Sequence, residues 1–149
     1  MIENSNLIEV FTDGASRGNP GLAGAGVLIN LFSNTHSLSV FLGKKTNNEA
    51  EYLALLLATR HLHQLINKKL STEQIASSQV IFYLDSKLVV EQMSDRWKIK
   101  DERMMGLATK CKKQIQEMGI QTKFVHVERD LNQEADRLAN QAIDLASDS

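Results

Sequence analysis

The first third of the chain alternates apolar and polar residues in short runs, a pattern typical of β-strands. It predicts strands over residues 7–12, 22–32 and 36–42, and the short connections between them indicate an antiparallel meander. Within the second run, Gly24 and Gly26 fall on the same face. Because a glycine inside a strand often marks the close approach of another backbone or a ligand, we expect tight packing against that face.

The rest of the chain alternates helical and extended patterns. The predicted order is a helix over 47–66, a strand over 78–85, helices over 86–93 and 101–118, a strand over 120–127 and a helix over 131–146. Three hairpin strands followed by this alternation predict an α/β fold with a five-stranded mixed sheet, in which an antiparallel meander of three strands joins two parallel strands and helices flank the sheet. No repeat or linker divides the sequence, so we expect residues 1–149 to form a single domain.

Composition narrows the class of protein. Apolar residues make up 42% and charged residues 23% of the chain, which is ordinary for a globular protein. The single cysteine, Cys111, excludes an internal disulfide and a multi-cysteine zinc site. No signal-peptide pattern opens the sequence, and no apolar run approaches the ~20 residues of a membrane span. We therefore expect a cytoplasmic protein with no membrane partner.

Basic residues are unevenly distributed, although the net charge is only −1. Seven of the seventeen lysines and arginines lie between Arg96 and Lys113, where only Asp101 and Glu102 oppose them. Two interpretations remain open. The segment is either a solvated helix face or a local patch that contacts phosphates.

Two predicted strands stop at an aspartate. Asp13 ends the first strand and is followed by Gly14, and Asp85 ends the strand over 78–85. An Asp-Gly pair is an ordinary turn signal. The alternative is a carboxylate that holds a ligand at the end of a buried strand.

The long helix carries two glutamates in different settings. Thr46 and Glu49 fit a capping box, and at 100° per residue Glu49 falls on the solvent face. Glu51 instead falls in the middle of the apolar stripe, which consists of Leu55, Ala58, Leu62, Leu65 and Ile66. Burying an unpaired charge is very costly, so Glu51 is the anomalous acid.

Asp136 lies at the border of the apolar arc of the last helix, and the pattern alone favours an exposed position. If it converges with Asp13, Glu51 and Asp85, each pair of carboxylates about 4 Å apart repels by roughly 4 kcal/mol at an effective dielectric constant near 20. Such a cluster takes up protons or binds cations. Hard oxygen ligands favour magnesium or manganese over zinc.

Four stretches, "FTDGASRGNPGLAGAG", "TNNEAEYLAL", "FYLDSKLVVEQM" and "HVERDLNQEADRLAN", resemble in order the signature blocks of the ribonuclease H family, type 1. The resemblance spans about residues 7–142. It implies the ribonuclease H-like fold and a hydrolase, an endonuclease that cuts the RNA strand of RNA–DNA hybrids and leaves 5′-phosphate and 3′-hydroxyl ends.

The resemblance also assigns the metal ligands to Asp13, Glu51, Asp85 and Asp136. They would hold two divalent cations, Mg²⁺ or Mn²⁺, on either side of the scissile phosphate. The position of Glu51 on the helix had already set it apart. On this interpretation, Asp13 ends a strand so that its oxygens can hold metal.

Substrate contacts carry over as well. Gly14 and Asn19 match positions near the RNA backbone, where 2′-hydroxyls distinguish RNA from DNA. Thr46, Asn47 and Asn48 match a block that contacts the DNA strand, although a capping role would account for Thr46 completely.

The chain departs from the best-known bacterial pattern before its last aspartate. That pattern has a histidine in a mobile loop. His126 stands at the matching distance, yet it lies on a predicted strand and shares a face with Phe124, which favours a buried structural residue. Arg129 resembles the arginine of branches that lack the histidine loop. We favour Arg129 as the catalytic residue and keep His126 as the alternative.

The basic protrusion that grips the hybrid in some members is shortened, so the chain resembles the branch without it. Trp97 is either a core residue or the place where a DNA backbone passes, and Lys87 could add a phosphate contact. We expect a monomer that acts on RNA–DNA hybrids. The alternatives are a catalytically weak nucleic-acid-binding relative and a nuclease that also cuts double-stranded RNA.

Overall fold

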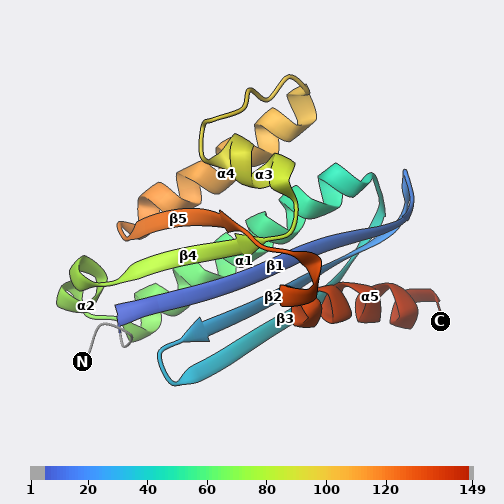
Figure 1. Cartoon of the computed structure of the whole chain (residues 1–149). Helices are drawn as coiled ribbons and strands as arrows, with labels where there is room; N and C mark the ends of the chain where they lie inside the picture. The colour runs from blue at the N-terminus through green and yellow to red at the C-terminus, as the bar shows by residue number, and fades with distance from the viewer. Residues whose placement is uncertain (1–5, 148–149) are drawn as a thin grey trace.

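The computed structural model describes residues 6–147, which form a five-stranded sheet with helices on both faces (Figure 1). The sheet order is β3-β2-β1-β4-β5. The strands are β1 (Leu7–Gly18), β2 (Gly21–Leu31), β3 (Asn34–Lys45), β4 (Gln79–Leu84) and β5 (Gln121–His126). The helices are α1 (Asn47–Lys69), α2 (Thr72–Ser77), α3 (Lys87–Met93), α4 (Glu102–Met118) and α5 (Gln133–Ser147), and a 3₁₀ turn covers Arg129–Leu131.

The pairing of the strands confirms the predicted mixed sheet. β1, β2 and β3 pair antiparallel, whereas β4 pairs parallel to β1 and β5 pairs parallel to β4. Two short elements were not predicted, α2 and the 3₁₀ turn. Neither buries a residue, so neither shows the apolar period by which a helix is recognised in a sequence.

The first strand does not end at Asp13, contrary to the prediction. β1 continues to Gly18 and forms a long hairpin with β2, in which Asp13 lies opposite Gly26. Only the pairing of β1 with β4 stops near this point, because β4 ends at Leu84, opposite Thr12. Asp13 therefore lies just beyond the parallel part of the sheet while its backbone is still held by β2.

The two faces of the sheet are covered by different helices. α1 packs against β1 and β2 on one face, and α5 packs against β2 and β3 on the other (Figure 1). The tight packing expected at the two glycines of β2 is confirmed. A Cβ atom on Gly24 would lie 2.2 Å from the carbonyl oxygen of Ala139, and one on Gly26 would lie 1.9 Å from that of Ala135. The backbone of α5 thus rests directly on β2.

The main hydrophobic core lies between the sheet and α1, with α4 packed beside α1. Its largest fully buried side chains include Tyr52, Phe82, Ile8, Ile29 and Leu62. Cys111 is also fully buried there, and burial raises the pKa of its thiol to about 12. Among the described residues, no helix is both long and apolar enough to cross a membrane.

Candidate active site

Four acidic side chains from distant parts of the chain line one cavity of about 390 Å³ at the end of the sheet. They are Asp13 of β1, Glu51 of α1, Asp85 after β4 and Asp136 of α5. Single carboxylate oxygens of Asp13, Glu51 and Asp85 all lie within 4.8 Å of one another. The convergence that the sequence left open is therefore present.

The backbone at Gly14 joins β1 to α1. A Cβ atom at this position would lie 2.1 Å from the carbonyl carbon of Ala50, so no larger residue fits while α1 lies this close. The Gly14 N–H donates to Oε1 of Glu51 at 3.1 Å. The glycine that was expected near an RNA backbone is thus required first by the approach of α1, and its amide orients one of the acids.

Glu49 is not on the solvent face, contrary to the prediction. The capping box itself is confirmed, because the Thr46 N–H donates to Glu49 Oε1 at 2.9 Å and the Glu49 N–H donates to Thr46 Oγ1 at 3.1 Å. Arg103 of α4 then covers the carboxylate at 2.7 Å, so that Glu49 is only 7% exposed. The Thr46 amide and the Arg103 guanidinium hold the pKa of Glu49 below its ordinary value. A helical projection considers one helix alone, so it could not predict that α4 covers Glu49.

Asp85 is held by a residue that the sequence did not reveal. Nδ2 of Asn132 donates to Oδ2 of Asp85 at 3.2 Å and to the carbonyl oxygen of Thr12 at 2.9 Å. The Asn132 side chain is 1% exposed, and it comes from the residue just before α5. The signal available in the sequence was its spacing, one helical turn before Asp136.

Asp136 is partly buried rather than exposed, which corrects the expectation from the pattern alone. Its backbone N–H donates a hydrogen bond to the carbonyl oxygen of Asn132, and its Oδ1 accepts one from Nδ2 of Asn140 at 3.2 Å. The helical pattern placed it at the border of the apolar arc. That border faces the end of the sheet, where the other three acids lie.

Burial and mutual repulsion of the carboxylates disfavour the charged forms of Asp13 and Glu51. Burial and the neighbouring carboxylates of Glu51 and Asp85 raise the pKa of Asp13 to about 9. Burial and Asp85 raise the pKa of Glu51 to about 8, despite the Gly14 amide and the positive charge of Arg129. The donors in this cluster are all carboxylate oxygens. Such a set fits hard divalent cations, which would replace the protons that the acids otherwise take up at neutral pH.

Arg129 and His126 occupy different positions relative to the cavity. Arg129 lies on the 3₁₀ turn between β5 and α5 and lines the cavity, as expected for a loop residue. His126 is the last residue of β5 and is exposed, so the interpretation as a buried structural residue is wrong. Phe124, two residues earlier, stacks on Phe82, but β5 is an edge strand and this packing does not extend to its end.

The predicted substrate-contacting residues near α1 gather at one side of the cavity. Asn47 lines the cavity, and its N–H donates to Oδ1 of Asn19 at 3.0 Å. Asn48 is exposed in the first turn of α1, while the Thr46 hydroxyl is engaged in the capping box. The tip of the β1–β2 hairpin is therefore tied to the beginning of α1.

Trp97 is 45% exposed, so the interpretation as a core residue is wrong. Nζ of Lys87 lies 6.0 Å from the centre of its ring. The basic segment is partly paired within the protein, and its contact with phosphates stays a prediction. Arg96 pairs with Glu91, Lys112 with Asp95 and Arg103 with Glu49, whereas other lysines of this segment, among them Lys98, Lys100 and Lys113, have no salt bridge within the part of the chain that the structure describes.

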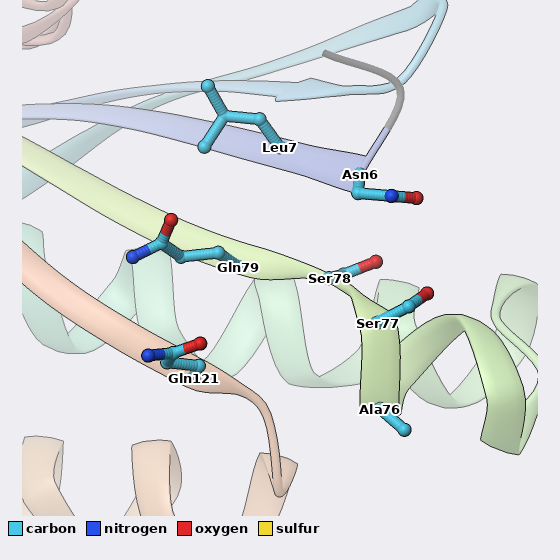
Figure 2. A pocket seen from close by; sticks show the side chains of 7 residues that line it. All are labelled: Asn6, Leu7, Ala76, Ser77, Ser78, Gln79 and Gln121. Atoms are coloured by element: carbon cyan, nitrogen blue, oxygen red, sulfur yellow. The ribbon is translucent and has the colours of Figure 1, made fainter. Parts of the chain in front are cut away.

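A second cavity, of about 290 Å³, lies at the opposite end of the sheet (Figure 2). Figure 2 shows its lining side chains, which are Asn6, Leu7, Ala76, Ser77, Ser78, Gln79 and Gln121. None of them is charged, and none of the four clustered acids reaches it. The acidic cavity is therefore the candidate site.

Comparisons with known proteins point to one family. The RNase H family profile matches residues 5–144. LC11-RNase H1 is a protein isolated from compost, and its crystal structure in complex with an RNA/DNA hybrid is similar to this structure. The TM-score is 0.83 at 38% sequence identity, and the match covers 93% of this chain and 98% of that one. Ribonuclease HI of Halobacterium salinarum is 30% identical over 95% of this chain and 67% of its own length.

A bifunctional protein of Mycobacterium tuberculosis is 35% identical over 150 residues. The match covers 95% of this chain but only 37% of the mycobacterial protein. The chain thus spans little more than a third of that relative.

Proposed function

Because the chain belongs to the ribonuclease H family, we propose that it hydrolyses the RNA strand of RNA–DNA hybrids. The observation that carries this proposal is the convergence of Asp13, Glu51, Asp85 and Asp136 in one open cavity. A module that only docks on nucleic acid would not need four acids in one cavity, where burial and neighbouring carboxylates raise the pKa values of Asp13 and Glu51. LC11-RNase H1, which shares the fold at 38% identity, has a hybrid bound in its crystal structure.

The four acids would hold two divalent cations, Mg²⁺ or Mn²⁺. Bound there, such ions supply a more acidic water for attack on phosphorus and charge stabilisation for the departing 3′ oxygen, so that the products carry 5′-phosphate and 3′-hydroxyl ends. The chain contributes orientation. The Gly14 amide fixes one oxygen of Glu51, and Asn132 fixes one oxygen of Asp85.

Arg129 is the better candidate for a further catalytic residue. It lines the cavity, and its charge acts on Glu51, so a guanidinium is available where negative charge develops on the phosphate. His126 is exposed at the end of β5 and does not line the cavity. A role for it would require the β5–α5 connection to move.

The hybrid would lie across the cavity from the beginning of α1 towards α3. Asn47 at the cavity edge, with Asn19, Thr46 and Asn48 beside it, supports a strand contact on one side. Lys87 and the exposed Trp97 offer a charge and an apolar face on the other side. The 2′-hydroxyls of the RNA would be recognised near Gly14.

A cleavage assay tests the proposal. The RNA strand is 5′-labelled and offered as RNA–DNA hybrid, as double-stranded RNA or as single-stranded RNA, each with Mg²⁺, Mn²⁺ or EDTA. We expect metal-dependent cutting of the hybrid that is lost in Asp13→Asn and retained in Glu117→Gln, a matched change of an exposed acid on α4. Tight binding of the hybrid without cutting would instead support the docking module. Equal cutting of double-stranded RNA would broaden the substrate class.

A further inference from the structure

A polar stripe begins just before α5 and continues along the helix through Asp136. Asn132, Asp136 and Asn140 follow one another at intervals of four residues, so they lie on one face of the helix. Asn132 holds Asp85, as described above. Asn140 is partly buried one turn after Asp136. It is the last residue of the stretch "HVERDLNQEADRLAN", and the family resemblance assigns it no role.

The amide group of Asn140 contacts Asp136 twice. Its Nδ2 donates to the carbonyl oxygen of Asp136 at 3.0 Å and to the carboxylate Oδ1 at 3.2 Å. The second contact leaves Oδ2 of Asp136 without a constraint from Asn140. A neutral amide also brings no positive charge, so it orients the carboxylate without weakening its attraction for a cation.

Arg17 determines which end of the amide faces Asp136. Its Nη2 lies 3.2 Å from Oδ1 of Asn140 and 2.7 Å from Oδ1 of Asp144. A guanidinium can only donate hydrogen bonds, so it faces the oxygen of the amide and not its nitrogen. The NH₂ group of Asn140 must then point to Asp136.

We propose that Asn140 is a positioning residue for Asp136, and that Arg17 of the β1–β2 hairpin fixes its amide in the orientation that donates. The chain of contacts runs from Arg17 through Asn140 to the Asp136 carboxylate. It connects the hairpin whose tip carries Asn19 to the cavity. This inference rests on the proposed role of Asp136 as a metal ligand.

Variants at Asn140 test the proposal. Asn140→Ala removes the donor and places the best helix former in α5, so the variant should fold. Asn140→Asp keeps the shape but replaces the donor by an anionic acceptor next to Asp136. Gln141→Ala serves as the matched control, because Gln141 is an exposed amide on the same helix.

The first readout is binding of Mn²⁺ to the protein without nucleic acid, followed by the electron paramagnetic resonance signal of free Mn²⁺. We expect Asn140→Ala to weaken Mn²⁺ binding about 10-fold, the usual scale for an outer residue that orients a ligand. Hybrid cleavage should recover largely at high Mn²⁺, and melting in EDTA should change as little as in Gln141→Ala. Unchanged Mn²⁺ binding in Asn140→Ala would overturn the proposal, whatever happens to its melting temperature.

Arg17→Ala tests the second half of the proposal. It should weaken Mn²⁺ binding less than Asn140→Ala, because the freed amide can still donate part of the time. Combined with Asn140→Ala it should add little, since both changes act through the same contact. Full additivity would refute the assigned role of Arg17. If the unmodified protein neither binds Mn²⁺ nor cuts the hybrid, the proposed function itself fails. If the unmodified protein does both and Asn140→Ala binds Mn²⁺ equally well, only the role of Asn140 fails.

Discussion

Replacing Asp13 by asparagine should abolish cleavage and at the same time stabilise the metal-free protein. Asp13 is buried among other acids, and its pKa is raised from 3.8 to about 9. A carboxyl group whose pKa is raised on folding contributes stability that is fully present below the unfolded pKa, near 4, and is lost as the pH rises towards 9. An amide of the same shape carries no charge and does not take part in this loss.

The size of the effect follows from the shift. Above pH 4, stability falls by about 1.4 kcal/mol per pH unit, which sets an upper limit of about 5 kcal/mol at pH 7.5. The buried amide must find partners of its own, which offsets about 1–3 kcal/mol. We therefore expect a net gain of up to about 2–4 kcal/mol, or a melting temperature about 5–15 °C higher for a domain of this size.

Thermal melts followed by circular dichroism in EDTA between pH 4.5 and 8.5 measure this difference. The gain in Asp13→Asn should be large at pH 8 and should vanish or become a small loss at pH 4.5, where the cost of burying the amide remains. Mg²⁺ should raise the melting temperature of the unmodified protein more than that of the variant. Glu117→Gln, an exposed acid, should show no such pH dependence. The reasoning is wrong if Asp13→Asn destabilises the protein at pH 8, or if its effect is the same at both pH values.

Three further changes probe other parts of the structure. Arg129→Ala should lower kcat on the hybrid with little effect on the melting temperature, because the side chain is exposed on a turn; equal losses of both would contradict its role. Asn132→Ala should lower the free energy of unfolding in urea by about 1–3 kcal/mol, because the buried carbonyl oxygen of Thr12 loses its donor, and it should also weaken Mn²⁺ binding. An unchanged unfolding midpoint would argue against the hydrogen bonds assigned to Asn132. Gly26→Ala should destabilise the fold by about 1–3 kcal/mol or more, because its Cβ would lie 1.9 Å from the Ala135 carbonyl, and normal stability would show that α5 can shift at little cost.

The order of the elements and the position of Glu51 could be predicted because both depend on local periodicity. Glu51 interrupts an apolar stripe, and that interruption is visible in any helical projection. The two glycines of β2 were informative for a similar reason, since a missing side chain at alternate positions implies a close neighbour. Patterns of this kind record which side of an element is covered.

The errors arose where another element decides the environment. Glu49 is buried by Arg103 of α4, more than fifty residues away in the sequence. His126 is exposed because β5 is an edge strand whose end is left uncovered, which the sequence of β5 does not show. The amides of Asn132 and Asn140 could not be assigned at all, because their roles depend on atoms of β1 and of the β4–α3 turn.

The placement of α5 has a consequence for how the protein acquires activity during synthesis. Arg17 and Asn140 meet across 123 positions of the chain, and Asp136 belongs to the same late helix. A nascent chain that has folded β1 to β5 but not yet released α5 from the ribosome has three of the four acids and an uncovered glycine face on β2. Such a chain cannot yet hold the complete set of ligands. If the proposed function holds, cleavage would therefore require α5 as well as the five strands and α1.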